Sequence, residues 1–287
     1  MLTWGTRTYL MGILNITPDS FSGDGLWREG NGVAAAVAQA QQFVADGADI
    51  LDIGAESTRP GSQPIAAAEE LDRLIPVIAA VRQAVEVPIS VDSYRAEVAR
   101  AALDAGANWV NDVWGFRMDE GMAKVVAEWG CPVVLMHNRS KPKDAIQEER
   151  LGGRYVGVHY NDLFADIIHE LQESIALAHA AGVKDEQIIL DPGLGFGKTV
   201  PQSLQLLNGL HQFKQLGYPL LIGPSRKSFI GYTLDLPPDE RVEGTTATVA
   251  IAIARGADII RVHDVKIMAR VAKMTDAITR KEEGGKR

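Results

Sequence analysis

Short apolar runs alternate with longer alanine-rich stretches along the whole chain, and this alternation predicts its fold. The runs have the length of buried strands, and the stretches between them, such as residues 33–45, 67–85, 96–105 and 162–181, repeat apolar residues at helical spacing. Alternating strands and helices are typical of a parallel sheet covered by helices. About eight such units favour an α/β fold closed into a single (β/α)8 TIM barrel. The predicted strands cover residues 9–14, 50–54, 88–91, 109–113, 133–137, 188–190, 220–223 and 259–262.

A six-residue pattern recurs at three of the predicted helix-to-strand junctions. It reads GADILD at residues 47–52, GANWVN at 106–111 and GADIIR at 256–261. The glycine can end the preceding helix in the left-handed region, and a tight turn then leads into a buried strand. The spacing is too irregular for a solenoid. The pattern indicates one junction reused around a barrel.

Polar side chains collect where the predicted strands end. In a closed parallel barrel these ends meet at one face, where ligands bind. Asp92, Asn111 and Asp191 each come at the end of a different strand. A planar amino-pyrimidinone would satisfy such a set, because it offers paired N–H donors to a carboxylate and further groups to an amide. A structural hydrogen-bond network or helix capping is the alternative explanation of these residues.

Cationic side chains stand in the same loops and need a different explanation. Helix capping does not account for them, because a cation beside a helix N-terminus opposes the helix dipole. An anionic ligand would reverse that cost. Arg261 and His263 are two residues apart, so on a strand they point to one side and could bind a phosphate together; a surface pair is the alternative. The cations of these loops are Arg59, Arg226, Lys227, Arg261 and His263.

Composition narrows the class of protein. The 287 residues are 46% hydrophobic and 23% charged, which suits one globular domain, predicted at residues 1–279 with a frayed charged tail at 280–287. The net charge of −8 gives no support for nucleic-acid binding. One cysteine, no signal-like segment and no membrane-length apolar run predict a cytoplasmic protein without membrane attachment.

Several common cofactor motifs are absent from the sequence. The glycine loop at residues 191–198 meets neither the Walker A nor the dinucleotide-binding pattern. There is no HExxH sequence and no zinc-type spacing of Cys and His. A metal, if used, would be a hard ion with oxygen ligands, such as Mg²⁺ bound together with a phosphate.

Seven short motifs together resemble the dihydropteroate synthase family, and they span nearly the whole chain in order. This family joins 6-hydroxymethyl-7,8-dihydropterin diphosphate to p-aminobenzoate in folate synthesis and releases diphosphate. Two loops depart from the family pattern: Gly54-Ala55-Glu56 replaces Gly-Gly-Glu, and Gly23 separates Ser22 from Asp24. The motifs are NITPDSFS at 15–22, ESTRPG at 56–61, SVDS at 90–93, ND at 111–112, DPGLGFGK at 191–198, SRKS at 225–228 and RVH at 261–263.

The resemblance implies roles for individual residues, and these are carried over as expectations. Asp92, Asn111, Asp191 and Lys227 would hold the pterin, and Met136 and Phe196 would pack near it. Asn15 would bind Mg²⁺ together with the diphosphate. The resemblance also implies a homodimer, with the small-molecule substrates as the other partners, and a target for sulfonamides, which mimic p-aminobenzoate; how sensitive it is to them does not follow from the sequence. The anion site would comprise Arg261, Val262 and His263, and the p-aminobenzoate site Pro60, Phe196 and Ser228, with Thr58 and Arg59 on a mobile loop over the substrates. The catalytic set would be Asp92, Asp191, Lys227, Arg261 and His263.

Three other functions compete with this interpretation. A methyltetrahydrofolate:corrinoid methyltransferase would not need the ESTRPG and SRKS motifs. A non-catalytic pterin-binding paralogue could lose Asn15, Arg261 or His263, and all three are present. An aldolase-like barrel enzyme would need a Schiff-base lysine, for which Lys227 beside Arg226 is the one candidate. Diphosphate release that depends on both the pterin and p-aminobenzoate would distinguish these functions.

Overall fold

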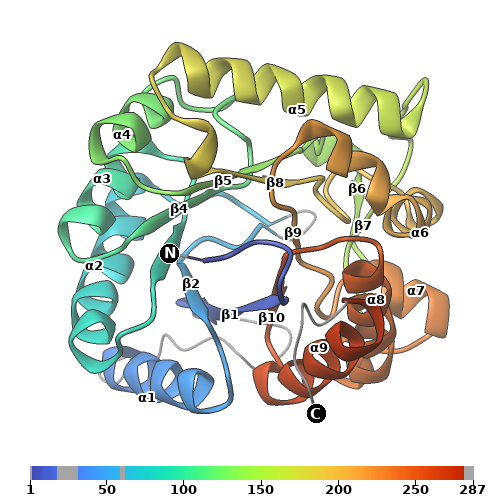
Figure 1. Cartoon of the computed structure of the whole chain (residues 1–287), viewed down its shortest axis with the longest axis horizontal. Coiled ribbons are helices and arrows are strands. Elements are labelled where there is room, and N and C mark those ends of the chain that lie inside the picture. The colour runs from blue at the N-terminus through green and yellow to red at the C-terminus, as the bar shows by residue number, and fades with distance from the viewer. Residues whose placement is uncertain (1, 18–31, 59–61, 281–287) are drawn as a thin grey trace.

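The molecule is a ring of helices around a parallel barrel, seen in a computed structural model that describes residues 2–17, 32–58 and 62–280 (Figure 1). Each of the eight predicted strands is present within one or two residues of its predicted bounds. The barrel strands are β1 (Tyr9–Asn15), β2 (Ile50–Gly54), β3 (Ile89–Asp92), β4 (Trp109–Asp112), β5 (Val133–Met136), β8 (Ile188–Asp191), β9 (Leu221–Ile222) and β10 (Ile259–Val262).

The strands follow one another around the barrel in chain order. The hydrogen-bonded order is β8-β5-β4-β3-β2-β1-β10-β9, and every pair is parallel. A parallel bridge between Leu190 and Leu220 brings β8 beside β9 and nearly closes the ring. The predicted TIM barrel is therefore confirmed. Closure brings the carboxyl ends of all eight strands to one face.

Nine helices in the described ranges surround the strands, and Figure 1 shows them following the ring in chain order. Each buries an apolar side against the barrel. None of them combines the length and the apolar character needed to cross a bilayer. The helices are α1 (Gly32–Ala45), α2 (Ala67–Ala84), α3 (Ala96–Asp104), α4 (Met122–Trp129), α5 (Leu163–Ala180), α6 (Val200–Asn208), α7 (Ser228–Leu234), α8 (Val242–Ala254) and α9 (Val265–Thr279).

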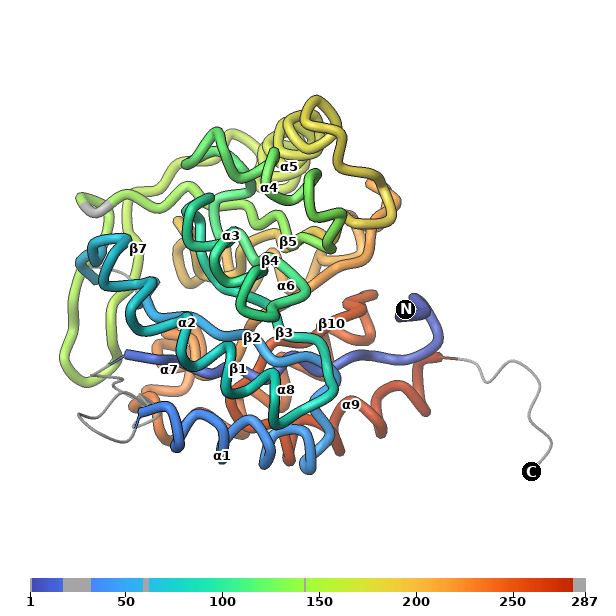
Figure 2. The backbone as a smooth tube through the Cα atoms, turned by 90° about the vertical axis from the view of Figure 1, so that its left-hand side faces the viewer, coloured from blue at the N-terminus to red at the C-terminus, as the bar shows by residue number. Residues whose placement is uncertain are grey.

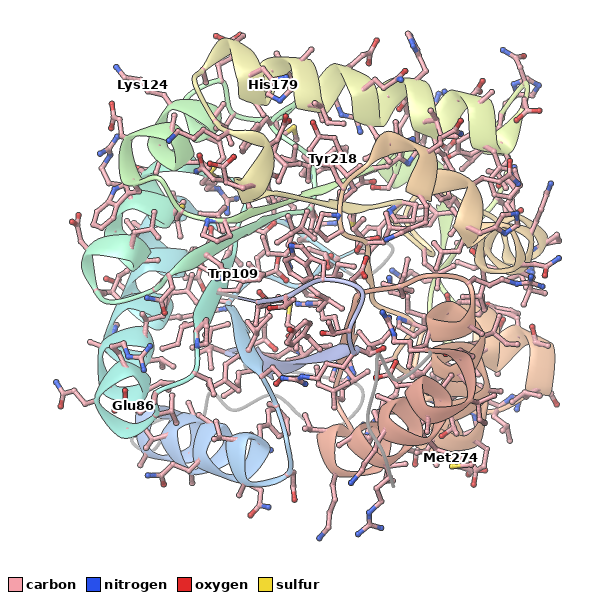
Figure 3. All side chains as sticks on the ribbon, in the orientation of Figure 1. Glu86, Trp109, Lys124, His179, Tyr218 and Met274 are labelled. Carbon is pink, nitrogen blue, oxygen red and sulfur yellow. The ribbon has the colours of Figure 1, made fainter. Side chains whose placement is uncertain are left out.

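The interior of the barrel has an apolar layer below a polar one. The apolar layer is a separate buried cluster, distinct from the larger core between strands and helices. Trp109 lies in this layer, near the middle of the ring in Figure 3. Since side chains two apart on a strand share a face, the next inward residue of four of these strands is polar. The apolar members Ile50, Trp109, Ile189 and Ile259 are thus followed by Asp52, Asn111, Asp191 and Arg261.

The recurring six-residue pattern does more than turn the chain. Its glycines have φ between +103° and +113°, as a left-handed helix end requires. Its third residue, Asp49, Asn108 or Asp258, accepts a hydrogen bond from the backbone N–H of Leu10, Ile89 or Leu220 at the start of a neighbouring strand. Arg7, Arg82 or Lys214 supplies a second donor to the same side chain. At each of its three occurrences, the pattern therefore holds two neighbouring strands together at the amino-terminal end of the barrel.

One segment was not predicted from the sequence. Between β5 and α5 the chain forms a short antiparallel hairpin of β6 (Ala145–Ile146) and β7 (Arg154–Tyr155). It reaches the region after β9, where Tyr232 donates to Glu148 and Arg241 donates to the carbonyl of Leu151. Figure 2 shows the β7 segment on the left, the side toward which β1 runs. The hairpin therefore stands beside the carboxyl-end face of the barrel.

Candidate active site

The polar layer of the barrel is a compact ion-pair cluster centred on Arg261. Its Nε donates to Asp52 Oδ2 at 2.5 Å, and its Nη2 donates to Asp92 Oδ2 at 2.6 Å. Asn111 donates to the same oxygen of Asp52 at 3.1 Å. Asp92 and Asn111 are direct neighbours in the register of β3 and β4. The structure therefore brings Asp92, Asn111 and Arg261 together, as the sequence predicted.

Asp191 reaches the same cluster from the other side of the barrel. It ends β8, and its Oδ1 accepts a hydrogen bond of 2.7 Å from the N–H of Gly193. Lys227 lies close enough to Asp191 and to Asp92 for both carboxylates to act on its pKa. The lysine donates to the carbonyl of Leu194 and lies 4.6 Å from the centre of the Phe196 ring. Asp191 and Lys227 thus belong to one site with Arg261.

Burial brings the pKa values of Asp92 and Lys227 close to neutral pH. It raises the pKa of Asp92 to about 7, with Arg261 opposing the rise and Asp52 adding to it. It lowers the pKa of Lys227 to about 8, against the opposing effect of Asp191. It also raises the pKa of Asp191, which Lys227 opposes. Titration close to working pH, produced by burial and charged neighbours, is typical of functional sites.

The glycine loop after β8 is shaped by packing against the end of β5. Gly193 has φ +71°, and a Cβ there would lie 1.8 Å from the carbonyl oxygen of His137. A Cβ on Gly197 would lie 2.5 Å from the backbone of Arg139. Only glycine fits such close backbone approaches. The loop therefore holds Phe196 and the Leu194 carbonyl beside Lys227 by contact with the neighbouring strand.

The loops after β9 and β10 are joined through Ser225 and Asp264. Ser225 Oγ lies 2.9 Å from Nδ1 of His263 and also accepts from its backbone N–H. Arg226 has φ +55° and makes a two-point ion pair with Asp264, at 3.0 and 2.6 Å. Arg226 is therefore engaged by a structural partner beside the site. Lys227, the next residue, faces Asp191 and Phe196 instead.

The remaining predicted residues that the structure describes lie at the carboxyl-end face, except that the side chain of Val262 points elsewhere. Asn15 ends β1, Thr58 follows β2, Met136 ends β5, and Ser228 begins α7. Val262 is fully buried in the core between barrel and helices, because strand alternation turns it away from its neighbours Arg261 and His263. Its side chain does not face the site, so any ligand contact would come from its backbone. Arg59, Pro60 and Asp24 lie outside the described residues.

Asp52 is the main site residue that sequence reasoning missed. It is fully buried in the middle of β2 and accepts from both Arg261 and Asn111. The signal was present in the sequence, since a carboxylate interrupts the apolar run 50–54. Moreover Asp52, Asn111 and Arg261 hold the same sixth position of the recurring pattern. Two of these equivalent positions, Asn111 and Arg261, thus meet at the third, Asp52.

A second missed group lies behind the glycine loop. Lys198 is buried, with its Nζ 3.0 Å from Nδ1 of His137 and 3.0 Å from the carbonyl oxygen of Phe196. Burial and the nearby Lys198 lower the pKa of His137 to about 3, so the imidazole is neutral. Nε2 of His137 is 3.1 Å from Glu170, which also pairs with Arg117 and Arg139. This network supports the loop from behind, and the Lys198 ammonium lies close enough to Asp191 to oppose the rise of its pKa.

The described residues suit a metal that arrives with its ligand. They contain no group of three or more His, Cys, Asp or Glu side chains arranged to hold a metal ion. Asn15 offers one amide oxygen, half-buried at the end of β1. Mg²⁺ typically takes one or two protein ligands, and substrate phosphates and water complete its shell. A magnesium ion carried by a diphosphate would therefore fit this donor set.

Comparison with known proteins agrees with the geometry of the site. A model of the pterin binding enzyme family matches residues 11–263. The dihydropteroate synthase of Clostridium beijerinckii is 49% identical over 278 residues, which is 96% of each chain. The family model therefore covers every barrel strand except the first two residues of β1, and every predicted site residue from Asn15 to His263.

Solved structures give the same result for the fold. The crystal structure of dihydropteroate synthase from Clostridium difficile in the presence of pteroic acid has a TM-score of 0.88 and 46% identity, and covers 98% of this chain and 100% of that one. The Yersinia pestis dihydropteroate synthase with a sulfonamide drug complex has a TM-score of 0.86 and 40% identity, and covers 95% and 94%.

Proposed function

The chain belongs to the pterin-binding enzyme family and, within it, to the dihydropteroate synthases, and from this premise we propose how its residues carry out the reaction. The enzyme is a transferase of folate synthesis. It joins the methylene carbon of 6-hydroxymethyl-7,8-dihydropterin diphosphate to the amine of p-aminobenzoate and releases diphosphate. The observation that carries the residue assignment is the buried cluster in which Arg261 contacts Asp92 at 2.6 Å.

The pterin ring is proposed to bind against the acids of the polar layer. Asp191 would accept N–H groups of the pyrimidinone edge. The N–H of Gly193 donates to Oδ1 of Asp191 and so fixes the orientation of the carboxylate toward the ring. Asp92 and Asn111 would contact the opposite part of the ring from adjacent strands. Lys227 would donate to a ring acceptor, with Met136 and Phe196 packing on the ring. The crystal structure of the Clostridium difficile enzyme in the presence of pteroic acid, a pterin joined to p-aminobenzoate, supports a pterin site in this fold.

Departure of the diphosphate is proposed to precede attack by the amine. The C–O bond to diphosphate breaks, and both electrons leave with that oxygen. Positive charge then spreads from the methylene carbon into the pterin, where Asp92 and Asp191 stabilise it. Arg261, His263 and the Val262 backbone would stabilise the leaving diphosphate. Mg²⁺, held by Asn15 and the diphosphate, would add positive charge at the leaving group when it is bound.

The second half of the reaction needs positioning more than base catalysis. The lone pair of the arylamine nitrogen forms the new bond to the methylene carbon, and the resulting ammonium then loses one proton to water. An arylamine is a weak base and reaches the transition state with its lone pair free, so no strong general base is required. Thr58, Arg59, Pro60, Phe196 and Ser228 are proposed to hold the p-aminobenzoate ring and carboxylate. Sulfonamides, which share that shape, are expected to compete for this position, as the Yersinia pestis complex suggests.

Diphosphate release tests the function directly. We expect release of diphosphate only when dihydropterin diphosphate, p-aminobenzoate and Mg²⁺ are all present, with formation of dihydropteroate in equal amount. Coupled detection of diphosphate and chromatography of the pterin product measure both. Release that does not depend on p-aminobenzoate would contradict the transferase reaction and would point to hydrolysis.

The pH dependence follows from two buried groups. Asp92, whose pKa burial raises to about 7, must be ionised to accept from the pterin, so kcat/KM should fall as pH decreases through about 7. Lys227, whose pKa burial lowers to about 8, must be protonated to donate, so kcat/KM should fall as pH rises through about 8. Initial rates at low pterin concentration should give a bell with its maximum between these values. A profile that stays flat down to about pH 5 would contradict the assignment to Asp92.

We also propose that the enzyme is a cytoplasmic homodimer formed through α8 and α9. The exposed side of α9 carries Ile267, Val271, Met274 and Ile278 at helical spacing, and Met274 and Ile278 are 63% and 71% exposed. Figure 3 shows Met274 at the outer edge of the molecule. The adjoining α8 has no charged residue from 244 to 254 and exposes Ile251. Apolar stripes of this kind mark protein interfaces.

Placing charge on this stripe should separate the subunits. Light scattering on Met274→Glu combined with Ile278→Glu should give half the mass of the parent protein, because two carboxylates would be buried at the contact. Leu177→Glu is the matched control, since Leu177 is 44% exposed on α5, on the opposite side of the ring in Figure 1. A monomeric parent protein, or a dimeric double variant, would contradict this interface.

A further inference from the structure

The carboxylate of Asp52 differs from the structural carboxylates of this barrel. Asp112 accepts from the backbone N–H groups of Trp114 and Phe116, and Asp49 accepts from that of Leu10. These bonds hold the chain in place. Within the described residues, the hydrogen bonds of Asp52 come from side chains alone, those of Arg261 and Asn111. Asp52 therefore fixes side chains of the site and no backbone turn.

Both side chains that donate to Asp52 belong to residues that are proposed to contact the substrates. They meet at a single atom, Oδ2, at 2.5 Å from Arg261 and 3.1 Å from Asn111. The other oxygen, Oδ1, is buried with no hydrogen-bond partner among the described residues. A buried carboxylate of this kind is costly unless it is paired, and the contact with Arg261 supplies that partner and holds the guanidinium in turn.

The two carboxylates on Arg261 have different consequences for ligand binding. Asp52 lies deeper, fully buried in the barrel, whereas the side chain of Asp92 keeps 12% exposure. Asp92 is the carboxylate expected to receive the pterin, so its contact with Nη2 must weaken when the ring binds. The Nε contact with Asp52 can persist. The guanidinium would then stay fixed at its base while its outer N–H groups turn to the ligand.

We propose that Asp52 is a positioning residue, which anchors Arg261 through Nε and Asn111 through Nδ2 so that both face the substrates. This role rests on the proposed function of Arg261 at the diphosphate. Misplacement of a reacting or binding group by about 1 Å can lower a rate by about 100-fold. An anchor shared by two such groups is therefore expected to have a large effect without touching substrate.

Two substitutions separate the charge of Asp52 from its hydrogen bonds. Asp52→Asn keeps the shape and an acceptor oxygen but removes the charge, and kcat/KM should fall about tenfold. Asp52→Ser also loosens the hold on both donors, and kcat/KM should fall about 100-fold. Asp49→Asn is the matched control, because Asp49 lies just before the same strand and bonds the backbone of Leu10 outside the site, and it should leave kcat/KM unchanged. If Asp52→Asn fails to fold, Asp52→Ser carries the same test.

A double-mutant cycle tests whether Asp52 acts through Arg261. In an Arg261→Ala background, measured by single-turnover assays, Asp52→Ser should lower the rate by at most about fivefold, the remainder acting through Asn111. An equal loss in both backgrounds would overturn the proposal. So would a wild-type rate for Asp52→Ser with only a lowered melting temperature, which is the outcome expected of a purely structural residue.

The pH profile gives a readout that loss of packing would not produce. The negative charge of Asp52 contributes to the raised pKa of Asp92. In Asp52→Asn the acid limb of kcat/KM should therefore move to lower pH, whereas in Asp49→Asn it should not move. An unmoved limb in Asp52→Asn would contradict the proposal. A near-wild-type Arg261→Ala would instead contradict the function proposed for Arg261, so the two failures can be told apart.

Discussion

Replacing Arg261 by alanine should lower kcat/KM for dihydropterin diphosphate by about 100- to 1,000-fold, equivalent to about 2.7–4 kcal/mol of transition-state stabilisation. The guanidinium bridges Asp52 and Asp92 and is the cation nearest to both. Its loss would remove positive charge from the departing diphosphate. It would also leave two buried carboxylates facing each other without a shared partner. Steady-state kinetics over a range of pterin diphosphate concentrations measures the loss.

The fall for Arg261→Ala should appear mainly in kcat, because charge on the leaving oxygen develops in the transition state. Arg255→Ala is the control, because Arg255 directly follows the C-terminal end of α8. It is exposed there and donates to Asn208. It should retain parent kinetics. Parent-like turnover by Arg261→Ala would remove this residue from the anion site.

Replacing Asp191 by asparagine should lower kcat/KM by about 1,000-fold or more, about 4 kcal/mol. The N–H of Gly193 donates to one oxygen of Asp191 at 2.7 Å. That donor would hold the amide oxygen of an asparagine in the same place and turn the NH₂ group toward the ligand. Two sets of N–H donors would then oppose each other. A site that leaves buried polar groups unpaired discriminates by several orders of magnitude.

Calorimetry with the pterin diphosphate separates this effect from a failure to fold. Asp191→Asn should keep a cooperative thermal transition but lose measurable heat of pterin binding. Asp185→Asn is the control, because Asp185 lies just before β8, is 72% exposed and pairs with His179 and Tyr218. Binding by Asp191→Asn within about tenfold of the parent protein would exclude Asp191 as the main pterin acceptor.

The strands and their order could be predicted from the sequence because the signals that define them are local. Each barrel strand is an apolar run bounded by turn residues, and each junction glycine is in place where a left-handed φ occurs. Parallel alternation then requires all carboxyl ends to meet at one face. That topology is enough to predict that Asp92, Asn111 and Asp191 lie at the same face of the barrel.

Three features of the structure could not be predicted from local patterns in the sequence. The apolar run at residues 50–54 predicts a buried strand and gives no role to Asp52, whose partner Arg261 lies 209 residues later. Arg226 was grouped with the anion-binding cations, but Asp264, 38 residues later, engages it. The β6–β7 hairpin has too few residues for a periodic signal. For Asp52 and Arg226 the deciding partner is distant in sequence, and a local pattern carries no information about it.

Local patterns are enough to predict the barrel, the face that carries the site and most of the side chains that stand there, since periodicity and strand ends depend on neighbouring residues. The contacts between those side chains depend on the folded barrel. Arg261 and Asp52 are 209 positions apart, and Arg261 and Asp92 are 169 apart. Closure of the barrel places them on one layer, and the exclusion of water from that layer gives their charges the strength and the shifted pKa values on which the chemistry depends.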